Sequence, residues 1–314
     1  MRFGAPLGGN LDHSLMRALS RRFGVRVRFD EPLSLRTTLG VGGPAKALVT
    51  VERKEELIAL LKTLHREGIP YLPLGGGSNL LVSERGFPGV VITLSGALSK
   101  LEVWGSTLRA GAGAPLSEAL KLAIECGLSG LEFAAGIPGT VGGAVANNSG
   151  GKDGCVADIF QGALVVTPEG DLIRLSPEEA GFFYRGSRIR RRRFIVVEVE
   201  FKLSPAKSAE VRREVEQRLR WRKEAQPLDK RSAGSIFKNP AHRAAGALLE
   251  AVGAKGLRRG GAVVSEKHAN FIVNEGGATA ADVWWLIREM RRRVLEEFGI
   301  WLELEVEPVG GWGE

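Results

Sequence analysis

The stretch Gly136-Ile137-Pro138-Gly139-Thr140-Val141-Gly142-Gly143-Ala144 follows a mid-chain segment with helical periodicity. Two more glycine clusters precede it, Gly40-Val41-Gly42-Gly43 and Gly75-Gly76-Gly77-Ser78-Asn79, the second directly after a predicted strand. Because glycine has no Cβ, such loops let backbone N–H groups converge on an anion. One cluster alone is typical of a tight turn. Three clusters in one half of a basic chain favour a nucleotide or dinucleotide ligand.

The glycine clusters fit neither of the common phosphate-binding motifs. None has the G-x-G-x-x-G spacing of a Rossmann site, and Gly111-Ala112-Gly113 is followed by Leu116 where the third glycine would stand. None has the G-x-x-x-x-G-K-[ST] spacing of a P-loop. The sequence therefore predicts phosphate binding by another loop geometry. The four histidines and two cysteines show no metal-ligand spacing, and no G-x-S-x-G elbow is present, so neither a metal site nor a hydrolase triad is expected.

The composition is that of an ordinary globular protein. The chain has 314 residues, of which 44% are hydrophobic and 25% charged, which is enough for two or three lobes. No apolar run approaches the roughly 18 residues that span a bilayer, and residues 1–10 lack the apolar core of a signal peptide. Cys126 and Cys155 cannot form a disulfide framework. We expect a cytoplasmic protein without membrane insertion; the oligomeric state stays open, with a monomer as the expectation.

The formal net charge of +8 has two interpretations. A basic protein can bind nucleic acid, or it can attract small polyanions such as nucleotides. The densest basic run is Arg188, Arg190, Arg191, Arg192 and Arg193, which is either a solvated strand entry or an anion-attracting rim. No aromatic residues are interleaved with it and no RRM, KH or zinc-finger pattern accompanies it, so no nucleic-acid partner is expected.

Hydrophobic periodicity predicts lobes that mix helices and strands without a regular βαβα alternation, an α+β arrangement. Residues 1–30, with Leu11 and Leu15 in a short helical pattern, form an expected peripheral segment. Helices are expected at 52–67, 116–125, 208–223 and 245–252, and from Thr279, where Asp282 completes a capping box. The expected boundaries are 31–204 for a first domain with lobes at about 31–98 and 99–204, divided at Ser204-Pro205 from a second domain at 205–314.

The last predicted strand runs from Trp301 to Glu307. Alternation along it places Glu303, Glu305 and Glu307 on one face. Periodicity alone does not choose among the three carboxylates, and a solvated face is the simpler interpretation.

Taken in order, the motifs resemble those of the UDP-N-acetylenolpyruvoylglucosamine reductase (UDP-N-acetylmuramate dehydrogenase) family of bacterial peptidoglycan synthesis. The resemblance covers about residues 30–310, and the ordered set is specific although any one motif is not. The matching elements are Thr38-Leu39-Gly40-Val41-Gly42-Gly43, Leu74-Gly75-Gly76-Gly77-Ser78-Asn79-Leu80-Leu81, Gly136 to Ala144, Tyr184-Arg185-Gly186-Ser187-Arg188, Gln226-Pro227, Ala233-Gly234-Ser235-Ile236-Phe237-Lys238-Asn239-Pro240, Gly260-Gly261-Ala262, Ser265-Glu266-Lys267-His268-Ala269-Asn270-Phe271 and Leu302-Glu303-Leu304-Glu305-Val306.

This resemblance implies a two-lobed FAD-binding domain of the p-cresol methylhydroxylase / vanillyl-alcohol oxidase type, followed by a C-terminal α+β substrate-binding domain. No histidine lies in the glycine loops, so we expect FAD to be non-covalent. The expected substrate contacts are Tyr184, Lys238, Asn239 and His268. The expected FAD contacts are Gly42, Gly75, Gly76, Gly77, Ser78, Asn79, Gly136, Ile137, Pro138, Gly139, Thr140, Gly142, Gly143, Ala144 and Asn148.

The family's reaction reduces an enolpyruvyl ether to a lactyl ether with NADPH, through FAD, for cell-wall biogenesis, cell shape and cell division. Hydride from flavin N5 reaches the substrate's terminal carbon, and negative charge develops at the α-carbon and its carboxylate. The resemblance assigns Arg185 to the carboxylate and Ser235 to proton donation. It also selects Glu305 from the three glutamates of the last strand. A glutamate that assists an enolate must donate a hydrogen bond, so we expect burial to raise the pKa of Glu305.

Without the resemblance, Ser235 is typical of a turn or N-cap serine and Arg185 of a surface arginine. Two departures from the commonest family pattern stand out. Residues Asn147-Asn148 follow the third glycine loop, and Asn148 aligns with the family asparagine. The longer class also carries a tyrosine-bearing loop over the substrate, whereas here only Tyr71 and Tyr184 exist, as expected for the shorter class.

Two other functions compete with this interpretation. Another FAD-linked oxidase or dehydrogenase would share residues 1–204 but would not need the Ser235 and Glu305 segments. A nucleic-acid-binding module would explain the charge but not the glycine loops. A flavin spectrum of the purified protein separates the second alternative from the flavin enzymes.

Overall fold

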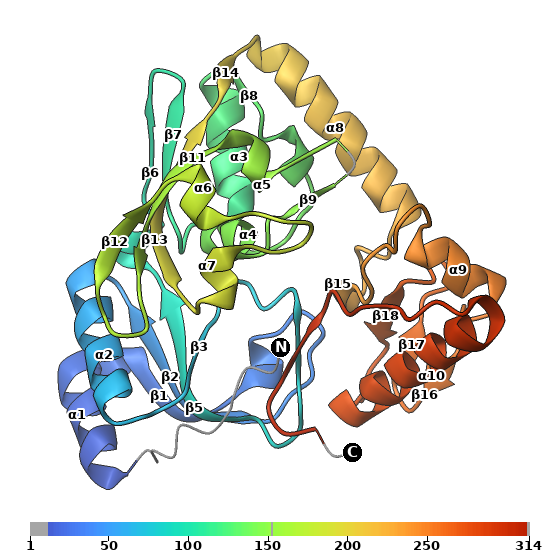
Figure 1. The fold of residues 1–314 in the computed structure, drawn as a ribbon, viewed down its shortest axis with the longest axis horizontal. Helices are drawn as coiled ribbons and strands as arrows, with labels where there is room; N and C mark the ends of the chain where they lie inside the picture. Colours follow the sequence, from blue (N-terminus) through green and yellow to red (C-terminus); the bar gives the residue numbers. More distant parts are fainter. Residues whose placement is uncertain (1–11, 152, 313–314) are drawn as a thin grey trace.

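The computed structural model describes residues 12–151 and 153–312, so Leu11 and the rest of the first eleven residues lie outside the described residues. Three lobes surround a central cleft (Figure 1). The expected helices are confirmed to within about two residues at each end. The capping box of Thr279 and Asp282 is present, with each side chain bonded to the other's backbone N–H at 3.1 and 3.0 Å.

The first lobe is a four-stranded sheet in the order β1-β2-β5-β3, in which β2, β5 and β3 are parallel and β1 is antiparallel. Helix α2 carries a stripe of buried leucines, Leu57, Leu60, Leu61 and Leu64, which pack with the sheet. Its elements are α1 (His13–Phe23), η1 (Gly24–Arg26), β1 (Val27–Pro32), η2 (Leu33–Leu35), β2 (Pro44–Val51), α2 (Lys54–Arg66), β3 (Tyr71–Pro73), β5 (Phe87–Leu94) and η3 (Gly96–Ser99).

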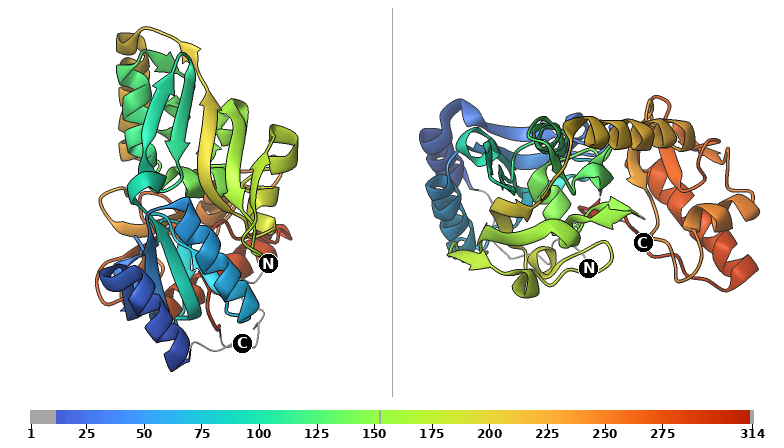
Figure 2. Two further views of the ribbon diagram at one scale, coloured as in Figure 1. Left: turned by 90° about the vertical axis from the view of Figure 1, so that its left-hand side faces the viewer. Right: turned by 90° about the horizontal axis from the view of Figure 1, so that it is seen from above.

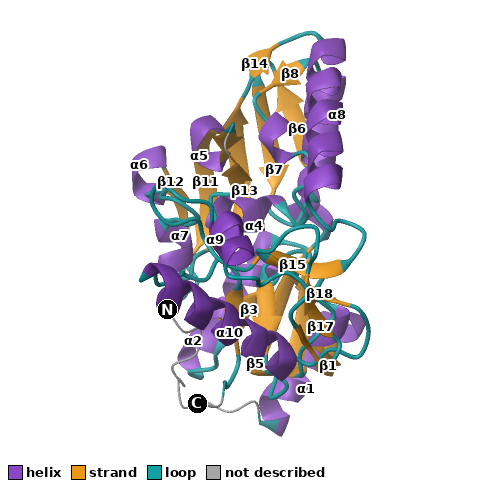
Figure 3. Ribbon diagram, turned by 90° about the vertical axis from the view of Figure 1, so that its right-hand side faces the viewer, coloured by secondary structure: helices purple, strands orange, loops and turns teal. Residues whose placement is uncertain are grey.

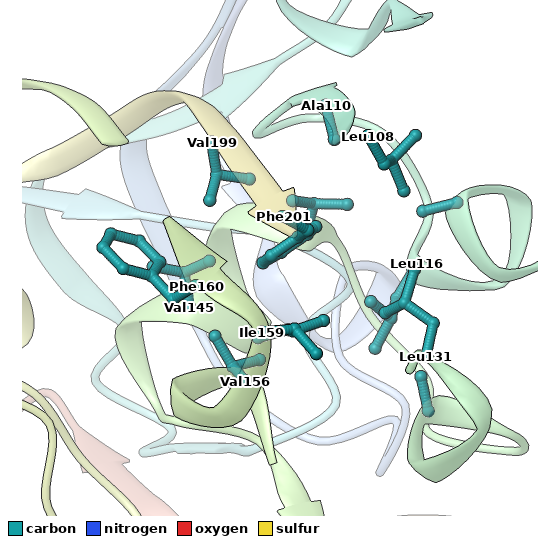
Figure 4. Close-up of a cluster of buried hydrophobic side chains, with 14 of the residues drawn as sticks. Leu108, Ala110, Leu116, Leu131, Val145, Val156, Ile159, Phe160, Val199 and Phe201 are labelled. Atoms are coloured by element: carbon teal, nitrogen blue, oxygen red, sulfur yellow. The ribbon is translucent and has the colours of Figure 1, made fainter. Parts of the chain in front are cut away.

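The second lobe is an antiparallel sheet in the order β12-β11-β13-β7-β6, with Phe201 fully buried at the centre of its core (Figure 4). Its strands β11 and β12 form a hairpin, and the side chains of Ser176 and Glu179 form a capping box. Its elements are β6 (Leu101–Trp104), β7 (Thr107–Gly111), α3 (Leu116–Glu125), β8 (Leu128–Ser129), η4 (Glu132–Ala134), α4 (Val141–Ala146), β9 (Gly150–Gly151), β10 (Gly154–Cys155), α5 (Val156–Ile159), β11 (Phe160–Val166), β12 (Leu172–Leu175), α6 (Pro177–Ala180), α7 (Arg188–Arg191), β13 (Ile195–Lys202) and β14 (Ser204–Pro205).

The third lobe is a four-stranded antiparallel sheet in the order β15-β18-β17-β16, covered by two helices. Its hydrophobic core also includes residues of the first lobe, because Leu39, Val41 and Leu81 are buried in it. The first and third lobes are therefore joined by apolar contact. The elements are β15 (Arg231–Ser235), α9 (Ala245–Ala251), β16 (Arg258–Arg259), β17 (Ala262–Val264), β18 (Phe271–Asn274) and α10 (Ala280–Phe298).

Helix α8 (Ser208–Ala225) connects the second lobe to the third (Figure 2 and Figure 3). Val211 and Val215 are buried in the core of the second lobe. The helix that follows Ser204-Pro205 thus shares a core with the residues before that expected boundary. The reason is packing: α8 contacts α3 and η4, and β14 pairs with β8.

The expected strand from Trp301 to Glu307 is wrong in its position. The strand here is β19 (Glu307–Val309), which pairs in parallel with β4 (Leu80–Val82) of the first lobe. Residues 304–309, here called the crossing segment, run from the third lobe back to the first (Figure 1). The solvated-face interpretation is also wrong, because Glu307 is 9% exposed and Glu305 is partly buried. Only Glu303 faces solvent.

A buried carboxylate in the first lobe, that of Glu56, is hydrogen-bonded by two arginines. Glu56 accepts hydrogen bonds from Arg26 at 2.9 and 3.0 Å and from Arg53 at 3.0 Å. The hydrogen bonds from Arg26 lower the pKa of Glu56 from 4.5 to about 2. This carboxylate therefore stabilises the fold in its ionised form.

Glu56→Gln should lower the free energy of unfolding at pH 7 by about 2–3 kcal/mol. A depressed folded-state pKa gives stability that is complete above 4.5 and is lost as the pH falls towards 2, so the difference from wild type should shrink across that window. Urea unfolding as a function of pH measures it. The exposed neighbour Glu55 supplies the control, Glu55→Gln, which should match wild type; a pH-independent deficit in Glu56→Gln would contradict the assignment.

Candidate active site

The three lobes enclose one cleft of about 2040 Å³. Pockets for one small ligand are usually about 300–1,000 Å³. The cleft therefore has room for two ligands of cofactor size. Its walls include β3 and β5 of the first lobe, the loops around α4 in the second, the inner face of α8, and β15 with residues 267–271 of the third.

Two glycine loops, residues 75–79 and 136–144, meet along one wall of this cleft. A Cβ on Gly76 would lie 2.8 Å from Cα of Gly139, and one on Gly75 would lie 2.5 Å from Oγ1 of Thr140. Both loops therefore need glycine at this contact. All of the expected FAD contacts from Gly75 to Asn79 and from Gly136 to Ala144 line the cleft.

The loop of residues 75–79 has the donors that a phosphate requires. Within the described chain, none of its backbone N–H groups donates a hydrogen bond, whereas the carbonyls of Gly77 and Asn79 accept from Thr38 and Glu307. Ser78 is tied to the other loop by donating to the carbonyl of Pro138 at 3.1 Å. Backbone N–H groups that have no acceptor in the protein and lie in a glycine loop suit a pyrophosphate.

Two expected FAD contacts are placed elsewhere. Gly42 lies outside the cleft lining and packs on β4, where a Cβ would be 2.7 Å from Cβ of Val82. Asn148 is 7% exposed and also outside the lining. Its amide donates to the carbonyl of Phe183 at 3.1 Å and accepts from the N–H of Ala157 at 3.0 Å, so it fastens surrounding loops. Its neighbour Asn147 lines the cleft.

Ser235 ends β15 and lines the cleft. It follows Gly234, whose φ of +73° is a conformation that other residues rarely adopt. The segment after it is clamped by Asn270, which is 3% exposed. The Asn270 side chain accepts from the N–H of Phe237 at 2.9 Å and donates to its carbonyl at 2.8 Å.

Glu305 lies beside the Ser235 segment, because its N–H donates to the carbonyl of Ile236 at 2.8 Å. Its own carbonyl accepts from the amide of Asn79 at 3.1 Å, which ties it to the glycine loop. Burial raises the pKa of Glu305 and outweighs the positive charges of Arg185 and Lys238, which act in the opposite direction. The expected direction of this pKa is thereby confirmed.

Arg185, which belongs to the second lobe, lies beside Glu305. Its φ of +56° belongs to a tight turn in which Phe183 and Gly186 exchange backbone hydrogen bonds at 3.0 and 3.1 Å. The guanidinium donates to the carbonyl of Gly150 at 2.6 Å, and its Nε lies 2.8 Å from Oε1 of Glu305 without hydrogen-bond alignment. Arg185, Ser235 and Glu305, far apart in the sequence, thus line one cleft.

A second arginine–glutamate ion pair lies in the cleft lining, and sequence patterns did not predict that these two residues would meet. Arg190 of α7 is 2.6 Å from Oε2 of Glu307 in the crossing segment. Burial raises the pKa of Glu307, and the charge of Arg190 opposes that effect. Oε1 of Glu307 is buried without a hydrogen-bond partner among the described residues. The basic run around Arg190 and the alternation of Glu303, Glu305 and Glu307 were the available signals, and neither indicated that Arg190 and Glu307 would meet.

The expected substrate contacts divide into two groups. His268 and Asn239 line the cleft, whereas Lys238 and Tyr184 do not. Lys238 pairs with Glu303 at 3.3 Å and Tyr184 is exposed. Burial lowers the pKa of His268, so its neutral form is favoured.

The described ranges contain no group of three or more His, Cys, Asp or Glu side chains placed to hold a metal ion. Across residues 12–151 and 153–312, no helix has the length and apolar character needed to cross a membrane.

Two family models match this chain. One, described as an FAD binding domain, matches residues 45–176, and the other, described as the C-terminal domain of UDP-N-acetylenolpyruvoylglucosamine reductase, matches residues 226–309. The UDP-N-acetylenolpyruvoylglucosamine reductase 2 of Symbiobacterium thermophilum is 45% identical over 92% of each chain. The chain belongs to the UDP-N-acetylenolpyruvoylglucosamine reductase family.

Other relatives agree with this assignment. The reductase of Moorella thermoacetica is 46% identical, covering 92% of this chain and 94% of its own. A crystal structure of the reductase from Thermus caldophilus matches with a TM-score of 0.78 at 43% identity, covering 89% of this chain and 97% of that one. The expected fold class, an FAD-binding domain with a C-terminal α+β domain, is confirmed, and the chain is an oxidoreductase.

The two family models cover different parts of the site. The glycine loops fall in the FAD-binding match, and Ser235 and Glu305 fall in the C-terminal match. Residues 177–225, with Arg185, Arg190 and all of α8, lie between the two matches. The cleft of this reductase is thus partly built from a segment that neither model covers.

Asn270→Ala should lower the stability of the third lobe by about 2–4 kcal/mol, because it leaves a buried N–H and a buried carbonyl of Phe237 unpaired. Urea unfolding followed by tryptophan fluorescence measures this. Asn270→Asp should lose at least as much, since an aspartate still accepts from the N–H but places a buried negative oxygen against the carbonyl of Phe237. Wild-type stability in Asn270→Ala would show that the clamp contributes nothing.

Proposed function

We propose that this chain catalyses the NADPH-dependent, FAD-mediated reduction of UDP-N-acetylglucosamine enolpyruvate to UDP-N-acetylmuramate, a step of peptidoglycan synthesis. The main support is the convergence of Arg185, Ser235 and Glu305 on one cleft beside two glycine loops. A flavin site alone would account for the loops. It would not account for a buried glutamate with a raised pKa next to an arginine and a serine.

FAD fits the glycine-loop wall, and when bound and reduced it supplies a hydride. Residues 75–79 offer backbone N–H groups for its pyrophosphate, and the close contact of Gly76 with Gly139 keeps this wall free of side chains. No histidine lies in either loop, which supports non-covalent binding. NADPH as the reductant is carried over from the resemblance.

Arg185 binds the carboxylate of the enolpyruvyl group. Its guanidinium is held by the carbonyl of Gly150, so the fork is oriented before the substrate arrives. As electron density moves into the carboxylate, the fixed positive charge stabilises it more in the transition state than in the ground state.

Glu305 donates a hydrogen bond to the same carboxylate in its protonated form. The raised pKa makes that form available at a higher pH than for an exposed glutamate. Arg185 opposes protonation from 2.8 Å. A substrate carboxylate that pairs with Arg185 would reduce this opposition.

Ser235 delivers the proton to the α-carbon. A serine hydroxyl is a weak acid, but the carbanionic centre is a strong base and the transfer runs downhill. Gly234 and the Asn270 clamp hold the backbone around Ser235 in one conformation. We assign the chain to the shorter class without a tyrosine loop, since residues 188–195 pass directly from α7 into β13.

Purified protein should show a flavin absorption spectrum and oxidise NADPH continuously only when the UDP-linked enolpyruvyl sugar is present. Because the hydride must pass through the flavin, NADPH alone should bleach the flavin without continued turnover. Stopped-flow absorbance at 450 nm and steady-state NADPH oxidation measure the two half-reactions.

The control is Ser235→Ala. It should keep flavin reduction by NADPH and lose reoxidation by the sugar by about 10²-fold or more. Protein that cannot be loaded with FAD, or whose NADPH oxidation ignores the sugar, would refute the proposed function.

Glu305→Gln should retain FAD and lose about 10²-fold or more in kcat. The active form of Glu305 is protonated, so wild-type activity should fall as the pH rises through its raised pKa, and Glu305→Gln should lack this limb. Rates measured across pH test both points. Glu297→Gln, the same change at an exposed site on α10, is the control; unchanged kinetics in Glu305→Gln would remove Glu305 from the mechanism.

A further inference from the structure

Trp221 is exposed and lines the cleft. Five of the six tryptophans of the chain have a ring partner: Trp104 lies under Arg109, Trp285 under Arg259 and Trp301 under Arg291, and Trp284 stacks on Trp312. Within the described chain, Trp221 has no such partner. Its side chain is 61% exposed, as are those of Trp104 and Trp301, but neither of these lines the cleft.

Arg222, the next residue, is half-buried, and its guanidinium has no carboxylate beside it among the described residues. Within the described residues, no carboxylate or hydrogen-bond acceptor pairs with its guanidinium, unlike Arg218, which is held by Glu214 at 2.7 Å. Burial and the positive charges of Arg185 and Arg218 lower the pKa of Arg222. An unpaired, partly desolvated guanidinium next to other cations is costly unless an anion pairs with it.

Both side chains belong to the last turn and a half of α8, where the helix passes from the second lobe to the third (Figure 3). The stem of Arg222 covers Gly136 of the glycine loop, at 3.1 Å from where its Cβ would be. Trp221 and Arg222 therefore lie between the glycine-loop wall and the third lobe, which is where a second ligand would meet the FAD site.

We propose that Trp221 and Arg222 form a nucleotide subsite, in which a base stacks on the indole and a phosphate pairs with the guanidinium. A flat π surface suits any base, and a guanidinium suits a phosphate. The inference rests on the proposed function, because the proposed reaction brings two nucleotide-bearing ligands to the cleft. These are the substrate with its UDP and the dinucleotide NADPH. The shared chemistry is a base with its phosphate.

The experiment titrates FAD-loaded enzyme with UDP and, separately, with NADP⁺, and follows tryptophan fluorescence and heat. Trp221→Ala should weaken the binding of one of these probes by about 5- to 100-fold, the usual contribution of one stacked base. Trp221→Phe should lose less, since it keeps an aromatic face. Trp104→Ala removes an equally exposed tryptophan outside the cleft and should bind both probes like wild type.

The two probes separate the sources of the nucleotide. A loss confined to UDP assigns the subsite to the sugar nucleotide, and a loss confined to NADP⁺ assigns it to the reductant. Unchanged affinity for both in Trp221→Ala overturns the proposal. These readouts are binding constants, so a failed turnover assay would refute the proposed function while leaving this result interpretable.

Arg222→Gln tests the phosphate half. It should weaken binding of the same probe and flatten the dependence of that binding on salt, because an ion pair is removed. Arg212→Gln, on the same helix but outside the cleft lining, is the matched control. If Arg222→Gln instead loses FAD and keeps probe affinity, the guanidinium serves the FAD and the phosphate half is overturned.

Discussion

The backbone hydrogen bonds of the crossing segment are the constraint on which the rest of the site depends. On one side the N–H of Glu305 donates to the carbonyl of Ile236, just after the Ser235 strand, at 2.8 Å. Beside it the N–H of Lys238 donates to the carbonyl of Glu303, just before the crossing segment, at 2.9 Å. On the other side Glu307 donates to Asn79 at 2.9 Å, and β19 continues as a parallel partner of β4. One extended stretch therefore fixes the distance between the Ser235 segment and the glycine loop. Without it the third lobe would be attached by α8, by apolar contact and by isolated hydrogen bonds, such as those from Thr38 to the carbonyl of Ser232 and from Asn274 to the carbonyl of Leu39.

The same segment carries two carboxyl groups that line the cleft, those of Glu305 and Glu307. Glu305 and Glu307 are two residues apart, and each meets an arginine from the second lobe, at 2.8 and 2.6 Å. Burial raises the pKa of both carboxyls while the arginines oppose it. Desolvating such pairs is costly, and their contribution to stability is correspondingly small. Their presence agrees with the role proposed for Glu305, and the pair of Arg190 and Glu307 links the neighbouring backbone to the second lobe.

Local signals predicted local structure well. The leucine stripe of α2, the capping box at Thr279 and the glycine loops could be read from the sequence because each depends on residues close together along the chain. The strand after α10 was misplaced because alternation does not reveal a partner strand more than 200 residues earlier. The place of Asn148 outside the cleft lining could not be predicted, because a buried asparagine that bonds to loops and one that meets a ligand look alike in sequence. The proposed roles of Arg185, Ser235 and Glu305 came from family resemblance, since spacing alone left Ser235 a turn residue.

Helix α8 shows why the remainder could not be predicted. Its sequence looks like a charged, solvated helix, and Val211 and Val215 are its only fully buried apolar residues among those described. Those two residues anchor it to the second lobe, and this anchoring turns Arg222 over Gly136 and leaves the face of Trp221 open. Because the helix is rigid over its length, its register on the second lobe decides what its last turns present to the cleft. The third lobe thus receives both its position and one wall of its ligand site from a helix whose core contacts are made elsewhere.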